Sequence, residues 1–110
     1  MKEPPFINRV KEFGNSSFKH CEAFRKIELC HNVDVVPENC FKNCSNLETI
    51  IFPYNQKNTI PRLETGCFNG CNKIQFVTIP CEEDVAIKQI DFGAFDNGAH
   101  QSLQFTFHHH

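Results

Sequence analysis

Seven cysteines and six histidines are the residues of this chain whose chemistry could serve a metal or a reaction. Cys40 and Cys44 are separated by three residues, and Cys67 and Cys71 repeat that spacing further along the chain. Four thiolates brought together from two such pairs would form the ligand set of a tetrahedral structural zinc site. One interpretation of these cysteines is therefore a zinc-stabilised structural module.

Histidines next to two of the cysteines raise the alternative of a thiol-dependent enzyme. His20 precedes Cys21, and His31 follows Cys30. A cysteine nucleophile needs a base within hydrogen-bond reach and a third group that orients the base. Residues adjacent in the chain rarely hold a base correctly, and no orienting group is evident. The sequence therefore predicts that the protein is not an enzyme and has no catalytic residue.

The choice between these interpretations depends on the elements that carry the cysteines, and those elements repeat. The string Phe-x-x-Cys occurs three times, and a fourth copy ends in Gly. Successive copies begin 23, 27 and 27 residues apart. A fixed internal period of this length indicates a solenoid built from one repeated unit. The aromatic and thiol positions of the repeat are Phe18, Cys21, Phe41, Cys44, Phe68, Cys71 and Phe95.

Each copy predicts the same local elements. In the second copy Ile50 and Phe52 alternate along the chain, which predicts a strand with both side chains facing inward. Residues 36–44 predict a single helical turn of α or 3₁₀ type, and residues 33–36 predict a second, shorter strand. The second and third copies contain four extra residues after the strand, within 54–59 and 81–86, which predict loops on one side of the solenoid.

The flanking copies favour packing over zinc as the role of the repeat cysteines. Ser17 and Ala94 replace the first cysteine of the pair, and Gly98 replaces the second. Positions that accept Ser, Ala and Gly are selected for small size, so we expect buried thiols there. No cofactor is therefore expected.

The same stacking argues against disulfide bonds. Cys44 and Cys71 would lie about one strand spacing apart, but equivalent residues on stacked turns point the same way, which is poor disulfide geometry. Cys30 and Cys81 lie at strand exits, outside the stacked column. We therefore expect these two thiols to be the exposed ones.

Stacking also defines the fold and its division along the chain. A unit of this size cannot bury its apolar face alone, but consecutive units can bury it against one another, with each Phe lying on the next. The sequence predicts a β-rich α/β solenoid with a parallel sheet and short helical turns on the other side. The expected units are residues 10–30, 33–53, 60–80 and 87–107. Residues 1–9 are expected to form a weak N-terminal cap, and residues 108–110 look like the remnant of a purification tag.

The repeat resembles the BspA-like leucine-rich repeat, I-x-x-I-G-x-x-A-F-x-G-C-x-x-L-x-x-I-x-I-P. Residues 13–21 and 68–80 look like copies of this motif, and the resemblance covers roughly residues 10–107. Phe replaces many aliphatic positions, and the fourth unit carries one extra residue. The resemblance implies a right-handed solenoid that acts as a non-catalytic binding or scaffold module. The family occurs in surface proteins of oral bacteria and parasitic protists. The resemblance therefore implies a role in adhesion or host-surface contact.

Composition limits the partners and the location. The 110 residues carry a formal charge of −2, which disfavours a nucleic-acid partner because such binding needs a basic surface. No apolar run approaches the ~18 residues of a membrane span. The N-terminal residues lack a hydrophobic signal core, which predicts a cytoplasmic protein, whereas the family resemblance implies the cell surface. The expected partner is another protein.

The candidate binding residues are those between the inward positions of each strand. The resemblance places them on the concave surface of the repeat ladder, where Ile51 and Phe76 would form an exposed apolar pair. The full set is Lys26, Glu28, Thr49, Ile51, Phe76, Thr78, Gln104 and Thr106. The two inserted loops are the next candidates. An uncapped end of the solenoid would expose apolar surface, so self-association is a further possibility.

Overall fold

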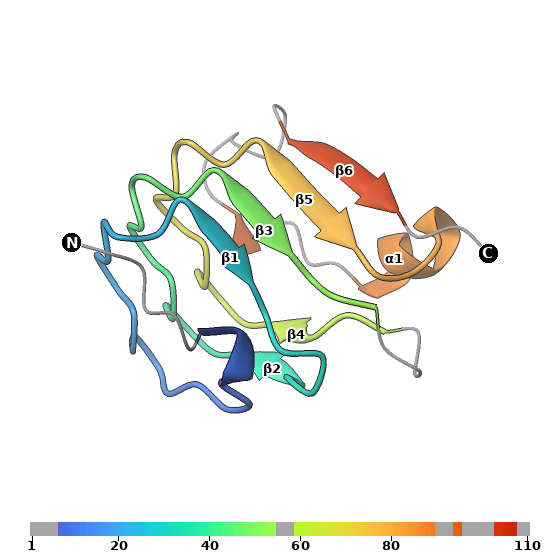
Figure 1. The fold of residues 1–110 in the computed structure, drawn as a ribbon, viewed down its shortest axis with the longest axis horizontal. Helices are drawn as coiled ribbons and strands as arrows, with labels where there is room; N and C mark the ends of the chain where they lie inside the picture. Colours follow the sequence, from blue (N-terminus) through green and yellow to red (C-terminus); the bar gives the residue numbers. More distant parts are fainter. Residues whose placement is uncertain (1–6, 55–58, 90–93, 96–102, 108–110) are drawn as a thin grey trace.

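A computed structural model describes residues 7–54, 59–89, 94–95 and 103–107. In chain order its elements are the 3₁₀ helix η1 (Ile7–Arg9), β1 (Lys26–Glu28), β2 (Val35–Val36), β3 (Thr49–Ile51), β4 (Arg62–Leu63), β5 (Phe76–Ile79), α1 (Glu83–Gln89) and β6 (Gln104–Phe107). Figure 1 shows strands β1, β3, β5 and β6 side by side, with β2 lying between β1 and β3 along the chain and β4 between β3 and β5. The tag-like residues 108–110 and most of the first predicted loop, 54–59, lie outside the described ranges.

Two parallel sheets organise the solenoid. The larger sheet has the order β1-β3-β5-β6, and β2 pairs with β4 in the smaller one. Across the larger sheet one inward rung contains Ile27, Ile50, Val77 and Phe105. The first three of these side chains are fully buried. The predicted strand register is therefore confirmed, and β2 and β4 confirm the second, shorter strand.

The phenylalanines of the repeat form a continuous column. The rings of Phe18, Phe41, Phe68 and Phe95 stack with centroid separations of 5.6, 5.5 and 5.4 Å. Their planes deviate from parallel by only 7°, 4° and 9°. Near-parallel rings at this separation are offset-stacked, an arrangement that aromatic pairs favour. The prediction that each Phe lies on the Phe of the next unit is confirmed.

The segments that carry these rings are tandem turns. Cys40 N donates to Pro37 O at 3.1 Å, and Lys42 N donates to Asn39 O at 3.2 Å, which are the i→i+3 bonds of successive β-turns. Asn39 and Asn43 have φ angles of 59° and 60°, in the left-handed region, so a continuous helix cannot form. The predicted helical turn is therefore a succession of tight turns.

Left-handed backbone recurs at the same two positions of the first three copies. The residues with positive φ are Ser16 and His20 in the first copy, Asn39 and Asn43 in the second, and Gly66 and Gly70 in the third. Asn and Gly adopt this conformation at lower cost than other residues. This backbone requirement explains why Asn and Gly recur beside the repeat cysteines.

Backbone hydrogen bonds join each turn to the next. Phe18 N donates to Cys40 O at 2.9 Å, Phe41 N to Cys67 O at 2.8 Å, and Phe68 N to Ala94 O at 3.0 Å. The turns thus form a ladder of their own across the core from the larger sheet. Within the described part of the chain, no polar or charged residue is buried in this core.

Described residues of the N-terminal flank and of the fourth unit join this core. Ile7 of η1 is buried and belongs to the core cluster, with η1 beside β1. At the other end, Phe95 bridges Phe68, which lies 27 positions earlier, whereas Phe105 pairs with Val77, 28 positions earlier. One extra residue therefore enters the fourth unit between Phe95 and Phe105, as the sequence predicts.

The segment 81–86, predicted to be a loop, runs instead into the helix α1. Ala86 N donates to Glu82 O at 2.9 Å, and Asp84 Oδ1 accepts from Val85 N at 3.0 Å. Acidic residues in a first helical turn interact favourably with the helix dipole, and Glu83 and Asp84 occupy that turn. The loop prediction was wrong because this local helix signal lies outside the repeat.

Of the helices in the described ranges, none is long and apolar enough to cross a membrane.

Candidate binding surface

The outward side chains of the larger sheet form two rungs across its four strands. The first rung contains Lys26, Thr49, Phe76 and Gln104, and the second contains Glu28, Ile51, Thr78 and Thr106. We call these eight residues the open sheet face. They are the same eight residues that the sequence predicts, and the strand pairing brings all of them together on one side of the sheet.

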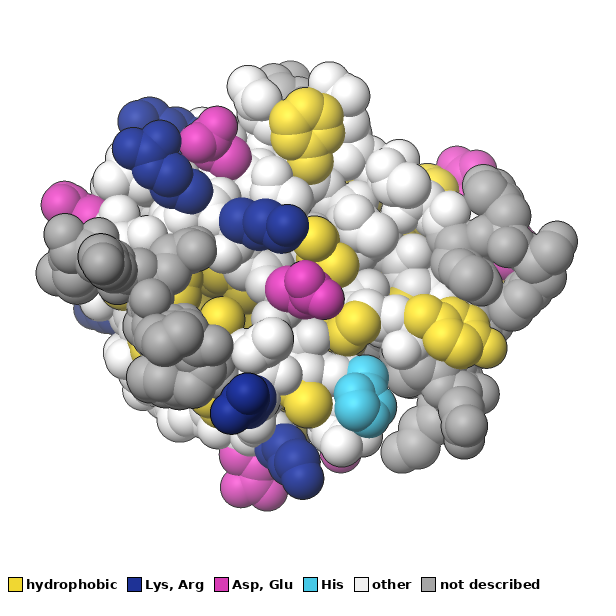
Figure 2. All heavy atoms as spheres, in the orientation of Figure 1, with side chains coloured by type: hydrophobic (Ala, Val, Ile, Leu, Met, Phe, Trp, Pro, Cys, Tyr) yellow, Lys and Arg dark blue, Asp and Glu magenta, His cyan; other side chains and the backbone are white. Residues whose placement is uncertain are grey.

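An apolar pair surrounded by polar residues lies at the middle of the open sheet face. Phe76 is 45% exposed, and Ile51 on the neighbouring strand is half-buried. Phe76 pairs across the sheet with Thr49 and Gln104, and Ile51 pairs with Glu28 and Thr78. In the view of Figure 2, hydrophobic side chains lie among single acidic and basic ones, without a broad field of one charge.

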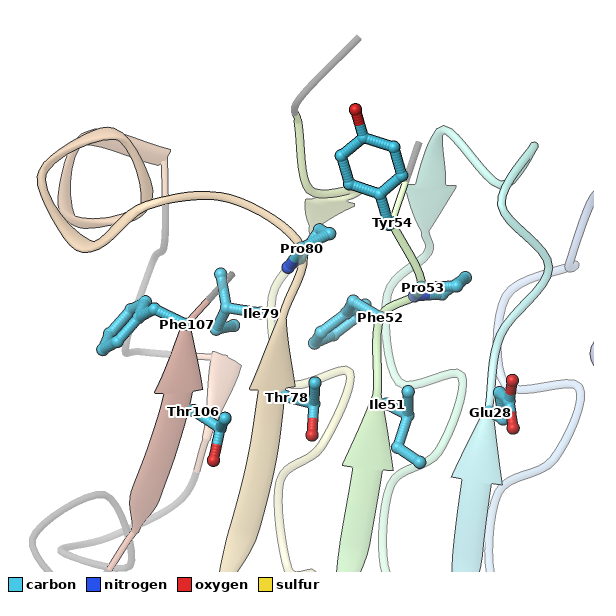
Figure 3. A pocket seen from close by; sticks show the side chains of 10 residues that line it. All are labelled: Glu28, Ile51, Phe52, Pro53, Tyr54, Thr78, Ile79, Pro80, Thr106 and Phe107. Atoms are coloured by element: carbon cyan, nitrogen blue, oxygen red, sulfur yellow. The ribbon is translucent and has the colours of Figure 1, made fainter. Parts of the chain in front are cut away.

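A hollow of about 340 Å³ lies at the carboxyl ends of the strands. Phe52 and Ile79, both buried, form its base, and Pro53, Pro80 and Tyr54 stand around it (Figure 3). Its remaining lining residues are Glu28, Ile51, Thr78, Thr106 and Phe107. We call this the carboxyl-end hollow. Reasoning from the sequence missed it, although the prolines that close the second and third strands were a signal for it.

A family model described as "BspA type Leucine rich repeat region (6 copies)" matches residues 1–108. The chain belongs to this leucine-rich repeat family. The family match and the parallel sheet confirm the predicted repeat and fold class. Domains of this family generally bind proteins and are typically non-catalytic. Neither the curated proteins nor the solved structures compared with the chain included a match.

The thiols of the leucine-rich repeat have a clear structural role. Cys44 Sγ donates to Phe18 O at 3.3 Å, and Cys71 Sγ donates to Phe41 O at 3.1 Å. Each thiol is small enough for the tight space beside the column and also supplies a weak hydrogen-bond donor to the preceding unit. A cysteine at this position therefore both packs and links adjacent repeats.

The same surroundings keep the Cys40 and Cys44 thiols protonated. The hydrogen bond with the Cys71 thiol, followed by burial, raises the pKa of Cys44, and burial raises the pKa of Cys40 to about 11. Because the thiolate is the form that binds metals and attacks electrophiles, a raised pKa works against both. None of the seven cysteines, all of which lie within the described residues, forms a disulfide bond. Within the residues that the structure describes, no group of three or more His, Cys, Asp or Glu is arranged to hold a metal ion.

The two histidines next to cysteines lie on exposed segments. His20 occupies a left-handed turn position with φ of 63°, and His31 follows the half-buried Cys30. The structure aligns His20 with Asn43 and Gly70, so this position is defined by backbone geometry.

The prediction that Cys81 is exposed was wrong. Its side chain is 0% exposed and belongs to the core cluster, whereas Cys30 is half-buried. Cys81 lies in the short segment between the end of β5 and the start of α1. This segment packs against the core, since Cys81 and Ala86 both belong to the core cluster. Burial raises the pKa of Cys81, and the Asp84 carboxylate raises it further.

Proposed function

We propose that this leucine-rich repeat domain is a non-catalytic module that binds another protein through its open sheet face. The observation that carries the proposal is an apolar pair on adjacent strands, the exposed Phe76 and the half-buried Ile51, on a sheet that is otherwise polar on this side. An apolar centre surrounded by polar residues is the arrangement of a small protein-binding site. A large aromatic residue at such a centre is a typical energetic hot spot.

The open sheet face carries few charges, so its choice of partner would depend mainly on shape. Lys26 and Glu28 place one charge of each sign on β1, and the other six residues of the face are uncharged. A partner would therefore gain most of its affinity from Phe76 and Ile51, with the β1 charges orienting it. Adhesion or host-surface contact is the wider role suggested by the family resemblance.

The four repeat units would each contribute one strand to the open sheet face. We propose units at residues 10–30, 33–53, 60–80 and 87–107, with residues 1–9 acting as a cap on the first unit. Burial of Ile7 beside β1 supports the cap.

Selection from a random peptide library displayed on phage tests the proposal even though the partner is unidentified. Binders enriched on the wild-type domain are measured against the double variant Ile51→Asp, Phe76→Asp. Lys19→Asp on the tandem turns is the control, since it changes the net charge by the same amount away from the sheet. We expect affinity for the double variant to fall at least about tenfold, the loss typical of a hot spot.

Circular dichroism establishes that each variant keeps the wild-type fold. Enriched peptides that bind the double variant as tightly as the wild-type domain would contradict the proposal. Size-exclusion chromatography with light scattering shows whether a second copy of the chain competes for the same face.

A further inference from the structure

We propose that the carboxyl-end hollow binds a short proline-rich peptide in the extended polyproline II conformation, with a basic residue of the peptide beside Glu28. The inference rests on the proposed function, because the hollow and the open sheet face share Glu28, Ile51, Thr78 and Thr106. It names the chemical class of partner that the carboxyl ends of the strands would select.

The walls of the hollow consist of aromatic and proline rings. Tyr54 is 53% exposed, and Phe107 is half-buried at the β6 side. Figure 3 shows Pro53 and Pro80 between the Phe107 side and the Glu28 side, with the Tyr54 ring standing above them. Grooves lined by aromatic side chains are the sites at which proteins recognise polyproline II segments. Rigid apolar walls of this kind therefore favour a partner with proline rings.

The backbone at the rim favours a peptide that needs no strand pairing. Pro53 and Pro80 have no N–H group, and Phe52 N already donates to Thr78 O at 3.0 Å. Leu29 N likewise donates to Ile51 O at 3.0 Å. These positions offer no backbone donor to an added strand. A polyproline II chain has no internal hydrogen bonds and keeps its backbone in water, so it can lie here without unpaired groups.

The dimensions correspond to a short extended segment. Glu28 on β1 and Thr106 on β6 end a rung of four strands, which spans about 14 Å at about 4.8 Å per strand spacing. A polyproline II chain rises about 3.1 Å per residue, so about five residues cross the rung. The volume of about 340 Å³ holds a few side chains, whereas an α-helix with side chains is about 10–12 Å wide.

One carboxylate at one end of the hollow would determine the orientation of a bound peptide. Of the ten residues that line it, Glu28 is the charged one, and it lies exposed at the β1 end. Among the described residues no salt bridge involves Glu28, whereas Arg62 and Glu64 form an ion pair elsewhere on the surface. A basic residue at one end of the peptide would complement this carboxylate, while the prolines cover Pro53, Pro80 and the aromatic rings. Charge complementarity thus selects a proline-rich peptide that ends in a basic residue.

Fluorescence polarisation with a labelled synthetic peptide tests this inference. The probe has alternating prolines and one terminal arginine, and the control peptide has glycine in place of every proline. We expect saturable binding of the probe, a loss of about tenfold in affinity with Tyr54→Ser, and a loss of up to about fivefold with Glu28→Gln. A probe with glutamate in place of arginine should regain affinity on Glu28→Lys. Equal binding of the glycine peptide, or no effect of Tyr54→Ser, would overturn the inference.

The outcome can be separated from that of the proposed function. Phe76 does not line the hollow, so the proline probe should lose less affinity with Phe76→Asp than with Tyr54→Ser. If library peptides depend on Phe76 and contain no proline, the open sheet face binds partners and the inference about the hollow fails. If neither the library nor the probe yields a binder, both proposals fail.

Discussion

Removal of one ring from the middle of the phenylalanine column tests what holds this leucine-rich repeat together. Phe41 is fully buried and stacks between Phe18 and Phe68 at 5.6 and 5.5 Å. It also meets Phe13 and Phe24 edge-on, at 5.6 and 5.9 Å. Phe41→Ala therefore removes a ring with four aromatic neighbours and leaves a cavity between two repeats.

The expected cost follows from this burial. Substitution of a buried Phe by Ala lowers the free energy of unfolding by about 3–5 kcal/mol, and the lost ring pairs place Phe41 toward the upper part of that range. A domain of this kind has a total stability of about 5–15 kcal/mol. Phe76→Ala is the matched control, since the same ring is removed from a side chain that is 45% exposed. We expect the control to cost less than about 1 kcal/mol.

Urea unfolding followed by far-UV circular dichroism measures both variants. The free energies of unfolding come from the linear dependence on urea, with the slopes compared to detect a change in cooperativity. If Phe41→Ala costs less than about 1.5 kcal/mol, or no more than Phe76→Ala, the column does not carry the stability that its packing indicates.

Three further predictions concern the turns and the thiols. Gly70→Ala should lower the free energy of unfolding by about 1–3 kcal/mol in the same urea assay, because φ is 79° and the added methyl would overlap the Asn43 side chain. The control Gly14→Ala should be neutral or slightly stabilising, because Gly14 has open space around it. Ellman's reagent should modify the half-buried Cys21 and Cys30 quickly and the other five thiols only on unfolding; rapid reaction of more than two thiols would contradict the burial pattern. Burial raises the pKa of Cys40 from 9.0 to about 11, so the folded chain binds more protons than the unfolded chain between these values. Stability should therefore be complete below pH 9 and fall as the pH rises toward 11, by up to about 1.4 kcal/mol per pH unit from this thiol. Urea unfolding at about pH 8 and about pH 10.5, on either side of the unfolded-state value, should show a smaller fall for Cys40→Ala, and an equal fall would contradict this cause.

The register of the sheet could be predicted from the sequence because equivalent positions in a repeat become neighbours in space. Ile50 could be assigned an inward position from its spacing to Phe52, and the repeat then placed Val77 beside it. The same reasoning placed Phe41 on Phe68 and put Phe76 on the outward side. One period, once recognised, therefore predicts both the core and the open sheet face.

The features outside the period could not be derived in this way. Cys81 lies one period after Tyr54, which is exposed, so the repeat gives no sign that Cys81 is buried. Its burial depends on how the inserted segment folds. Glu83 and Asp84 followed by Lys88 are charges suited to the two ends of a helix, and this local signal could have identified α1. The carboxyl-end hollow forms from side chains beyond the strand ends, such as Tyr54, whose arrangement depends on the three-dimensional packing of neighbouring units.

Nuclear magnetic resonance shows residue by residue whether a partner binds at the open sheet face. The ¹⁵N-labelled domain is titrated with a peptide enriched from the library, and the backbone amide shifts are followed residue by residue. The account predicts that the largest shift changes fall on β1, β3, β5 and β6, with Ile51 and Phe76 among them. Changes concentrated on the tandem turns or on β2 and β4, with the larger sheet unaffected, would contradict it.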